Sequence, residues 1–202
     1  MPRRKPSSRT WFKKATSLID DGWTFLAVDQ FTKRVQTVQR RGWHPIGSNP
    51  TIDVSSSRKK VTVLKAVTHD GETLHFWTEE TLTADHGIRL LRALRTKFGK
   101  KLVVLLDQAS YFYAKDLWEY VSGDRSTDTV DDTTVKFVEG DDLKIWYLPS
   151  HLPELNPVEN CWNQLKNCYK YRLIETLEEL KTTLPAAFRS ISEPDLLDYI
   201  CS

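Results

Sequence analysis

The stretch from Leu148 to Lys166, LPSHLPELNPVENCWNQLK, predicts a loop that leads into a helix with an acidic residue in its first turn. Asn156 is a favourable N-cap residue, Pro157 suits the first helical position, and Glu159 follows at the third. The pattern therefore predicts a carboxylate at a helix start. A capping box, in which Glu159 accepts from the backbone N–H of the cap residue, would explain the pattern without any function.

Two aspartates upstream favour a functional interpretation. Asp29 follows the apolar run Phe25–Val28, and Asp107 follows the run Leu102–Leu106. An aliphatic run closed by an acid is typical of a strand that is buried on both faces and ends at the acid. One such aspartate is usually a turn residue. Two of them, together with Glu159, form the oxygen-rich set of ligands that hard divalent cations require.

The order of the predicted elements indicates an α/β fold with a mixed sheet. The Asp70-Gly71 pair is a hairpin turn signal, and Gly99 is a helix stop signal. Hairpin strands followed by alternating strands and helices argue for a mixed central sheet. We expect strands near 24–29, 34–41, 61–68, 73–77, 102–106 and 143–148, and helices near 84–98, 114–121 and from 157 onward.

The helix that follows Asn156 has two different faces. Glu159 and Lys166 are predicted to lie away from the apolar stripe, so the carboxylate can point away from the core. The stripe comprises Val158, Cys161, Trp162, Leu165 and Tyr169.

The motifs around the three acids resemble those of the mariner-type DDE transposases of insertion sequences. The resemblance covers about residues 20–170 and is strongest over 148–166. Weaker matches are Val28-Asp29, the segment Arg41–Gly47, and Leu106–Ala109. The resemblance implies an RNase H-like fold, with a mixed central sheet flanked by helices.

The same resemblance implies a reaction and a site. Asp29, Asp107 and Glu159 would be the catalytic acids and the metal ligands of a domain that hydrolyses phosphodiesters and transfers DNA strands. The carboxylates imply two ions, Mg²⁺ or Mn²⁺, which in such sites lie about 3.5–4 Å apart and clamp the attacking and departing oxygens. Oxygen-only ligation argues against zinc. The implied substrate is double-stranded DNA, both transposon ends and target.

The sequence departs from the family pattern beside these acids, but it keeps all three. Gln30 and Gln108 replace an acidic residue and an asparagine, and the aromatic run Tyr111–Tyr113 occupies the region of a histidine. The separation of Asp107 from Glu159 is also long, which predicts a polar, acidic insert at about 122–142. Two alternatives therefore stay open: a catalytically inactive DNA-binding or oligomerisation remnant, and an RNase H-like nuclease that does not transpose.

Charge and length predict one domain preceded by a basic arm. The formal net charge is only +2, but basic residues crowd the first fourteen positions. We expect residues 1–20 to form a flexible arm and residues 21–202 to form the catalytic domain. Further basic residues are candidate contacts to DNA phosphates. These candidates are Arg40, Arg41, Lys59, Lys60 and Lys166.

The sequence also limits the location and the partners that we expect. No apolar run is long enough to span a bilayer, and no signal-peptide pattern follows the basic N-terminus, so we expect a cytoplasmic protein without membrane contact. About twenty residues precede the first expected strand, fewer than a helix-turn-helix module needs. A separate helix-turn-helix chain would then read the DNA. By resemblance, we also expect a homodimer.

Overall fold

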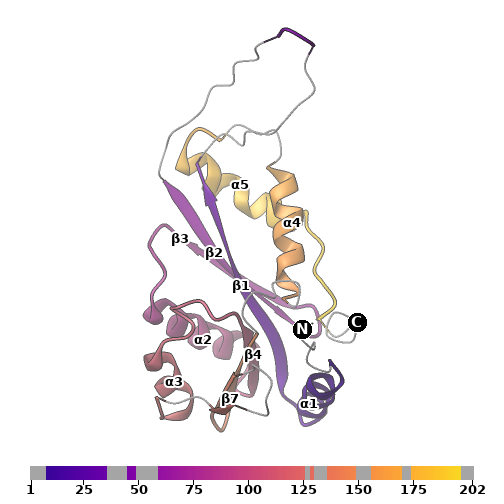
Figure 1. The fold of residues 1–202 in the computed structure, drawn as a ribbon, viewed down its shortest axis with the longest axis vertical. Helices are drawn as coiled ribbons and strands as arrows, with labels where there is room; N and C mark the ends of the chain where they lie inside the picture. The colour runs from indigo at the N-terminus through magenta and orange to yellow at the C-terminus, as the bar shows by residue number, and fades with distance from the viewer. Residues whose placement is uncertain are drawn as a thin grey trace, which may run out of the picture.

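A mixed sheet forms the centre of the computed structural model (Figure 1). The structure describes residues 8–35, 45–48, 59–125, 128–129, 136–148, 156–169 and 174–196. Within these residues, the middle strands β1, β4 and β7 run parallel to one another, and the outer pairings are antiparallel. The order across the sheet is β3 (Thr73–Thr78), β2 (Lys60–Thr68), β1 (Thr24–Arg34), β4 (Leu102–Leu106), β7 (Leu143–Tyr147), β6 (Lys136–Glu139) and β5 (Asp128–Thr129).

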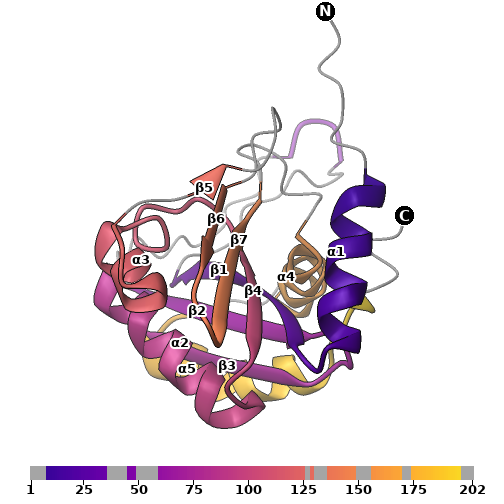
Figure 2. The same ribbon diagram turned by 90° about the horizontal axis from the view of Figure 1, so that it is seen from below.

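Helices cover both faces of this sheet. In Figure 2, α2 (Ala84–Phe98) and α3 (Lys115–Ser122) lie on one face, and α1 (Ser8–Asp20) and α4 (Val158–Cys168) lie on the other, to which α5 (Leu177–Arg189) also contributes core residues. Alternation along β1 separates the two cores, because Phe25 and Ala27 face α4 whereas Leu26 and Val28 face α2. The predicted mixed α/β fold is confirmed.

β1 is longer than its sequence predicts, and this changes the place of Asp29. The strand pairs with β4 from Thr24 to Ala27 and then continues beside β2 as far as Arg34. Asp29 therefore lies within a strand, so the prediction that the strand ends there is wrong. The polar residues after Asp29 stay in the sheet because β2 supplies a continuous antiparallel partner. The strand expected near 34–41 lies outside the described residues except for its first two positions.

The N-terminal segment is a helix where we expected a flexible arm. Ser8–Asp20 form α1, and residues 1–7 lie outside the described residues. Ala15 is buried, and the ammonium of Lys14 lies 3.0 Å from Glu139 and 4.6 Å from the centre of the Phe137 ring. The correction has a physical reason: the segment has an apolar side that packs on the sheet, and one of its basic residues anchors it to β6.

The polar insert expected at 122–142 also contributes to the fold. Gly123 ends α3 in a left-handed conformation (φ 75°), and the insert then adds β5 and β6 at the edge of the sheet. Phe137 and Val138 of β6 are buried. None of the helices in the described part of the chain is both long and apolar enough to cross a membrane.

Candidate active site

Asp29 is held rigidly on β1. The residue is only 8% exposed. Its Oδ1 accepts a hydrogen bond from the backbone N–H of Gln30 (2.8 Å), and its Oδ2 accepts one from Nε1 of Trp162 (2.8 Å). Burial raises the pKa of Asp29 from 3.8 to about 7; the two hydrogen bonds oppose this rise, and the charges of Asp107 and Glu159 add to it. A cation between the acids would favour the ionised form.

Asp107 lies beside Asp29 at the end of a neighbouring strand. In the parallel pairing of β1 and β4, Ala27 is level with Leu105, and continuing this register brings Asp107 level with Asp29. Adjacent strands are about 4.8 Å apart. The Oδ1 of Asp107 accepts from the backbone N–H of Ala109 (3.2 Å), and burial raises the pKa of this carboxyl too. The strand end predicted at Asp107 is confirmed.

Glu159 comes to the same region from the start of α4. Asn156 fixes that start: its Oδ1 accepts from the backbone N–H of Val158 (3.2 Å), and its Nδ2 donates to the carbonyl of Val28 on β1 (3.3 Å). The helix begins at Val158, one residue later than predicted. The carboxylate of Glu159 lies 3.6 Å from the ammonium of Lys166. Pro157 already has helical torsion angles (φ −61°, ψ −27°), so the side chain of Asn156 caps the helix from the residue before it, and the side chain of Glu159 is available for other contacts.

Trp162 is a site residue whose role the sequence did not predict. The side chain is buried, donates to Asp29, and stacks on Phe31 of β1 with ring centres 5.4 Å apart. Its spacing from Glu159 could have indicated this role. Trp162 follows Glu159 by three residues, about one helical turn, within the apolar stripe. The stripe itself is confirmed, since Val158, Cys161, Trp162, Leu165 and Tyr169 are all buried.

Gln108, one of the departures from the family pattern, has a structural role. Its Nε2 donates to the backbone carbonyl of Leu148 (2.9 Å), which follows β7. This bond connects the residue after Asp107 to the end of the next parallel strand. The glutamine therefore helps to hold the loop that carries Asp107.

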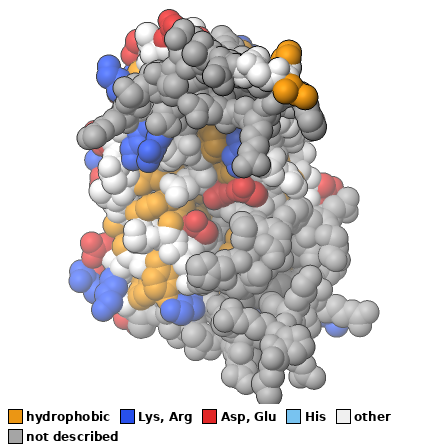
Figure 3. All heavy atoms as spheres, turned by 45° about the horizontal axis from the view of Figure 1, so that its top comes forward, with side chains coloured by type: hydrophobic (Ala, Val, Ile, Leu, Met, Phe, Trp, Pro, Cys, Tyr) orange, Lys and Arg blue, Asp and Glu red, His pale blue; other side chains and the backbone are white. Residues whose placement is uncertain are grey.

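Asp107 and Glu159 both lie close enough to Asp29 to act on its charge, but the three acids do not form a closed metal cage. Both Asp107 and Glu159 raise the pKa of Asp29 through their charges. Among the residues that the structure describes, no three Asp, Glu, His or Cys side chains have the arrangement of a metal site. An exposed ion pair such as Glu159–Lys166 contributes only about 0–1 kcal/mol, so turning Glu159 toward the aspartates costs little. Figure 3 shows acidic side chains together in the middle of one face.

The candidate DNA contacts fall in different places. Lys166 lies at the site, beside Glu159 and 5.9 Å from the centre of the Phe31 ring. Lys59 and Lys60 lie where β2 begins, and they line a hollow of about 490 Å³ that also contains the acidic residues Glu79 and Glu178. Arg40 and Arg41 lie outside the described residues. Of the three predicted contacts that the structure describes, Lys166 alone lies next to the acids.

Comparison with known proteins identifies the fold and the family. The structures with a similar fold include a Mos1 mariner paired-end complex with Mn (TM-score 0.61, 14% identity, 100% of this chain and 61% of that chain). A Mos1 mariner paired-end complex with Mg is also similar (TM-score 0.63, 16% identity, 98% of this chain and 57% of that chain). So is the catalytic domain of Mos1 mariner transposase (TM-score 0.58, 13% identity, 100% of this chain and 91% of that chain). This chain therefore spans about 61% of the length of the transposase chain in the Mn complex.

These likenesses confirm the predicted RNase H-like fold, and at such low identity they show the fold alone. No curated protein sequence matches this chain. The family model described as DDE superfamily endonuclease matches residues 24–181, a range that contains Asp29, Asp107 and Glu159. Because that match covers most of the chain, the protein belongs to the DDE superfamily endonucleases.

Proposed function

We propose that this chain is the catalytic domain of a DNA transposase, in which Asp29, Asp107 and Glu159 hold two divalent ions, Mg²⁺ or Mn²⁺. The observation that carries the proposal is the position of Asp29: the register of β1 and β4 brings Asp107 beside it, and hydrogen bonds from Asn156 and Trp162 join β1 to the start of the helix that carries Glu159. The family match and the likeness to complexes described as containing Mn or Mg support it.

The residues present suit hard divalent cations. All three supply carboxylate oxygens, and two of them are buried enough for their pKa values to rise, so a positive charge between them would be favourable. Bound ions would activate the attacking hydroxyl and stabilise charge on the leaving oxygen of a phosphodiester. Trp162 and Gln30 orient Asp29, the N–H of Ala109 orients Asp107, and Glu159 completes the set from α4.

The proposal includes the partners of the reaction. The substrate would be double-stranded DNA, as transposon ends and as target, and the similar Mos1 structures are described as paired-end and strand-transfer complexes. A second copy of the chain and a separate helix-turn-helix chain that reads the DNA would complete the assembly. The proposed location is the cytoplasm. An inactive remnant is less well supported, because Gln108, one of the departures that suggested it, stabilises the loop of Asp107.

Nicking of supercoiled plasmid tests the proposal. The wild-type chain should nick with Mn²⁺ or Mg²⁺ and stop when EDTA is added. Asp107→Asn should lose activity by about a hundredfold or more, because one ligand of a two-metal site is removed. Asp20→Asn, an exposed acid on α1, is the matched control and should nick like the wild type. Metal-dependent nicking that survives in Asp107→Asn contradicts the proposed ligands. A wild-type chain that never nicks favours the inactive remnant.

A further inference from the structure

The part of β1 beyond Asp29 forms a row of side chains with α4. Alternate residues of a strand point to the same face, so Asp29, Phe31 and Lys33 all face the helix. Asp29 accepts from Trp162, Phe31 stacks on the same Trp162, and the ammonium of Lys33 lies 5.9 Å from the centre of the Tyr169 ring. The row therefore continues from the candidate active site along the length of α4.

Two lysines, Lys33 and Lys166, lie on this row, and the positive charge of Lys33 has little to balance it among the described residues. Lys33 is half-buried, and burial lowers the pKa of its ammonium. Among the described residues, no acidic side chain forms an ion pair with it. The face of Tyr169 offsets part of the cost of burying the charge, as cation–π contacts do. Lys166 contacts the ring of Phe31 and forms an ion pair with Glu159. Lys33 is a half-buried cation that rests on an aromatic ring and forms no ion pair with a described acid, so it is suited to bind an anionic ligand.

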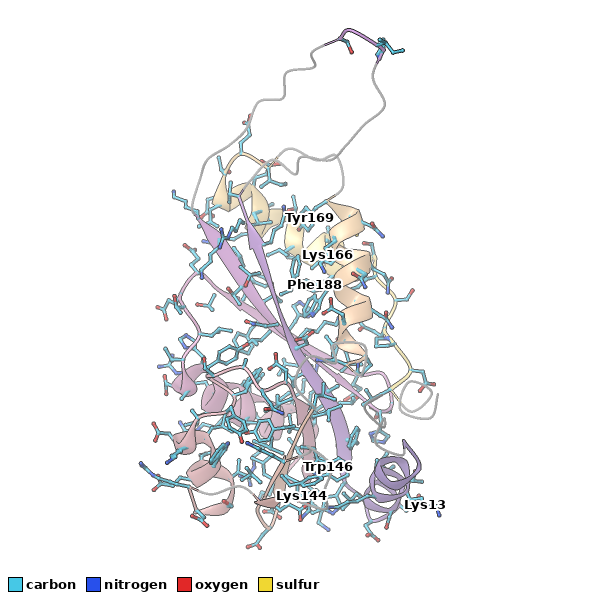
Figure 4. All side chains as sticks on the ribbon, viewed as in Figure 1. Lys13, Lys144, Trp146, Lys166, Tyr169 and Phe188 are labelled. Carbon is cyan, nitrogen blue, oxygen red and sulfur yellow. The ribbon has the colours of Figure 1, made fainter. Side chains whose placement is uncertain are left out.

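The spacing of the row fits the backbone of DNA. Lys33 follows Asp29 by four residues, which is about 13 Å along a strand. A DNA strand carries one phosphate for about every 3.4 Å of helix axis, so a phosphate about four positions from the one at the acids would lie near Lys33. Lys166 comes from α4 between these two points, since it contacts Phe31. In Figure 4, Lys166 and Tyr169 lie on α4 beside β1, whereas Lys13 lies on α1, well away from α4.

We propose that Lys33 and Lys166 form a phosphate-binding subsite that holds one DNA strand along β1 and α4, beside the three acids. This inference rests on the proposed function and extends it to Lys33, which is not among the DNA contacts that the sequence predicted. The subsite contacts phosphates without reading bases, so it serves any sequence. A phosphate at Lys166 also replaces Glu159 as its counter-charge, which frees the carboxylate to turn toward Asp29. Occupation of the subsite by DNA would then help to assemble the three acids.

Binding of a short labelled duplex, followed by fluorescence anisotropy over a series of salt concentrations, tests the subsite. Ca²⁺ replaces Mg²⁺ so that binding is measured without cleavage. Lys33→Gln should weaken binding roughly tenfold, as expected for a lost charge-assisted contact. It should also lower the slope of log K against log salt by about 1. Lys33→Arg should keep both values near wild type. Lys13→Gln removes an exposed lysine of α1 and should change neither.

The outcomes separate this inference from the proposed function. If the wild-type chain nicks DNA in the presence of metal but Lys33→Gln binds DNA like Lys13→Gln, the subsite is wrong and the catalytic proposal stands. If DNA binding depends on Lys33 but no chain nicks DNA, the subsite stands and the catalytic proposal fails. Thermal unfolding of each variant checks the fold. If Lys33→Gln does not fold, Lys33→Met, which keeps an apolar stem over Tyr169, decides by the same two criteria.

Discussion

Asp29 and Glu159 belong to the same candidate site, yet the strand and the helix hold them in opposite ways. Asp29 is 8% exposed, has two hydrogen-bond donors fixed on it, and has a pKa raised to about 7. The side chain of Glu159 is 36% exposed and contacts one lysine. The carboxylate on the strand is therefore held in one position, and its ionisation costs free energy because it is buried. The carboxylate on the helix is partly exposed and free to change its direction. Variants at the two residues should differ in stability even where both abolish cleavage.

The largest expected effect is a pH dependence of stability that comes from Asp29. Its pKa is about 7 in the folded chain, against an ordinary value of 3.8. Between these values the folded state binds more protons than the unfolded state, so the metal-free protein loses stability as pH rises from about 4 to about 7. The change from 3.8 to about 7 corresponds to roughly 4 kcal/mol.

Urea unfolding of the metal-free protein at a series of pH values from about 4 to about 8 covers this range and checks the expectation. Asp29→Asn should flatten most of the dependence, with a residual slope from Asp107, whose pKa is also raised by burial. Asp20→Asn, which removes an exposed acid of α1, is the control and should keep the wild-type slope. Equal slopes for wild type and Asp29→Asn would show that the buried carboxylate is not the source.

Trp162→Phe should have the next largest effect, because it removes the donor to Asp29 and keeps an aromatic ring against Phe31. Losing a hydrogen bond to a charged carboxylate costs about 2 kcal/mol, and the loss should be larger above pH 7 than at acid pH. Trp118→Phe is the control, since it removes a neutral bond to Tyr147 Oη (2.9 Å). Unfolding at acid and alkaline pH compares the two. Parallel pH curves for both variants would contradict a special role for Trp162.

Asn156→Ala should lower the free energy of unfolding by about 1–2 kcal/mol, because it removes both the cap of α4 and the bond to β1. It should also slow nicking, because α4 carries Glu159. Thr176→Ala removes the corresponding cap of α5, whose Oγ1 accepts from Glu179 N–H (3.1 Å). That control should show a similar loss of stability with normal nicking. Urea unfolding and plasmid nicking of both variants make the comparison, and slow nicking in both would remove the specific link to Glu159.

The smallest effect should follow Lys166→Gln, measured on stability without DNA. The ion pair with Glu159 is 3.6 Å long and exposed on both sides, so the loss should stay within about 1 kcal/mol. A double-mutant cycle with Glu159→Gln measures the coupling directly. A coupling well above this range would mean that Glu159 is fixed by the lysine and that the contrast between strand and helix is wrong.

The sequence predicted those elements whose signals are local. The helix at Ala84–Phe98 matches its predicted bounds because its apolar period and Gly99 define it. The hairpin between β2 and β3 has Gly71 at φ 84°, as the Asp-Gly signal indicated. The strand end at Asp107 follows from five consecutive aliphatic residues that are all buried.

Features that depend on tertiary partners were missed. Gln30, Thr32 and Lys33 look like residues that leave a sheet, and only the pairing with β2 and the packing against α4 keep them in a strand. The basic composition near the N-terminus concealed a helix whose small and apolar residues pack on the sheet. The bond from Trp162 to Asp29 joins residues 133 positions apart, and spacing along the chain contains no sign of it.

In the proposed function, Asp29, Asp107 and Glu159 together bind divalent ions. Calorimetric titration with Mn²⁺ tests it directly, using the wild-type chain, Asp29→Asn, Glu159→Gln and the control Asp20→Asn. We expect Mn²⁺ binding by the wild type and Asp20→Asn, no measurable binding by Asp29→Asn, and clearly weakened binding by Glu159→Gln. Wild-type affinity in both site variants, or no binding of Mn²⁺ by the wild type, would contradict the proposed ligands.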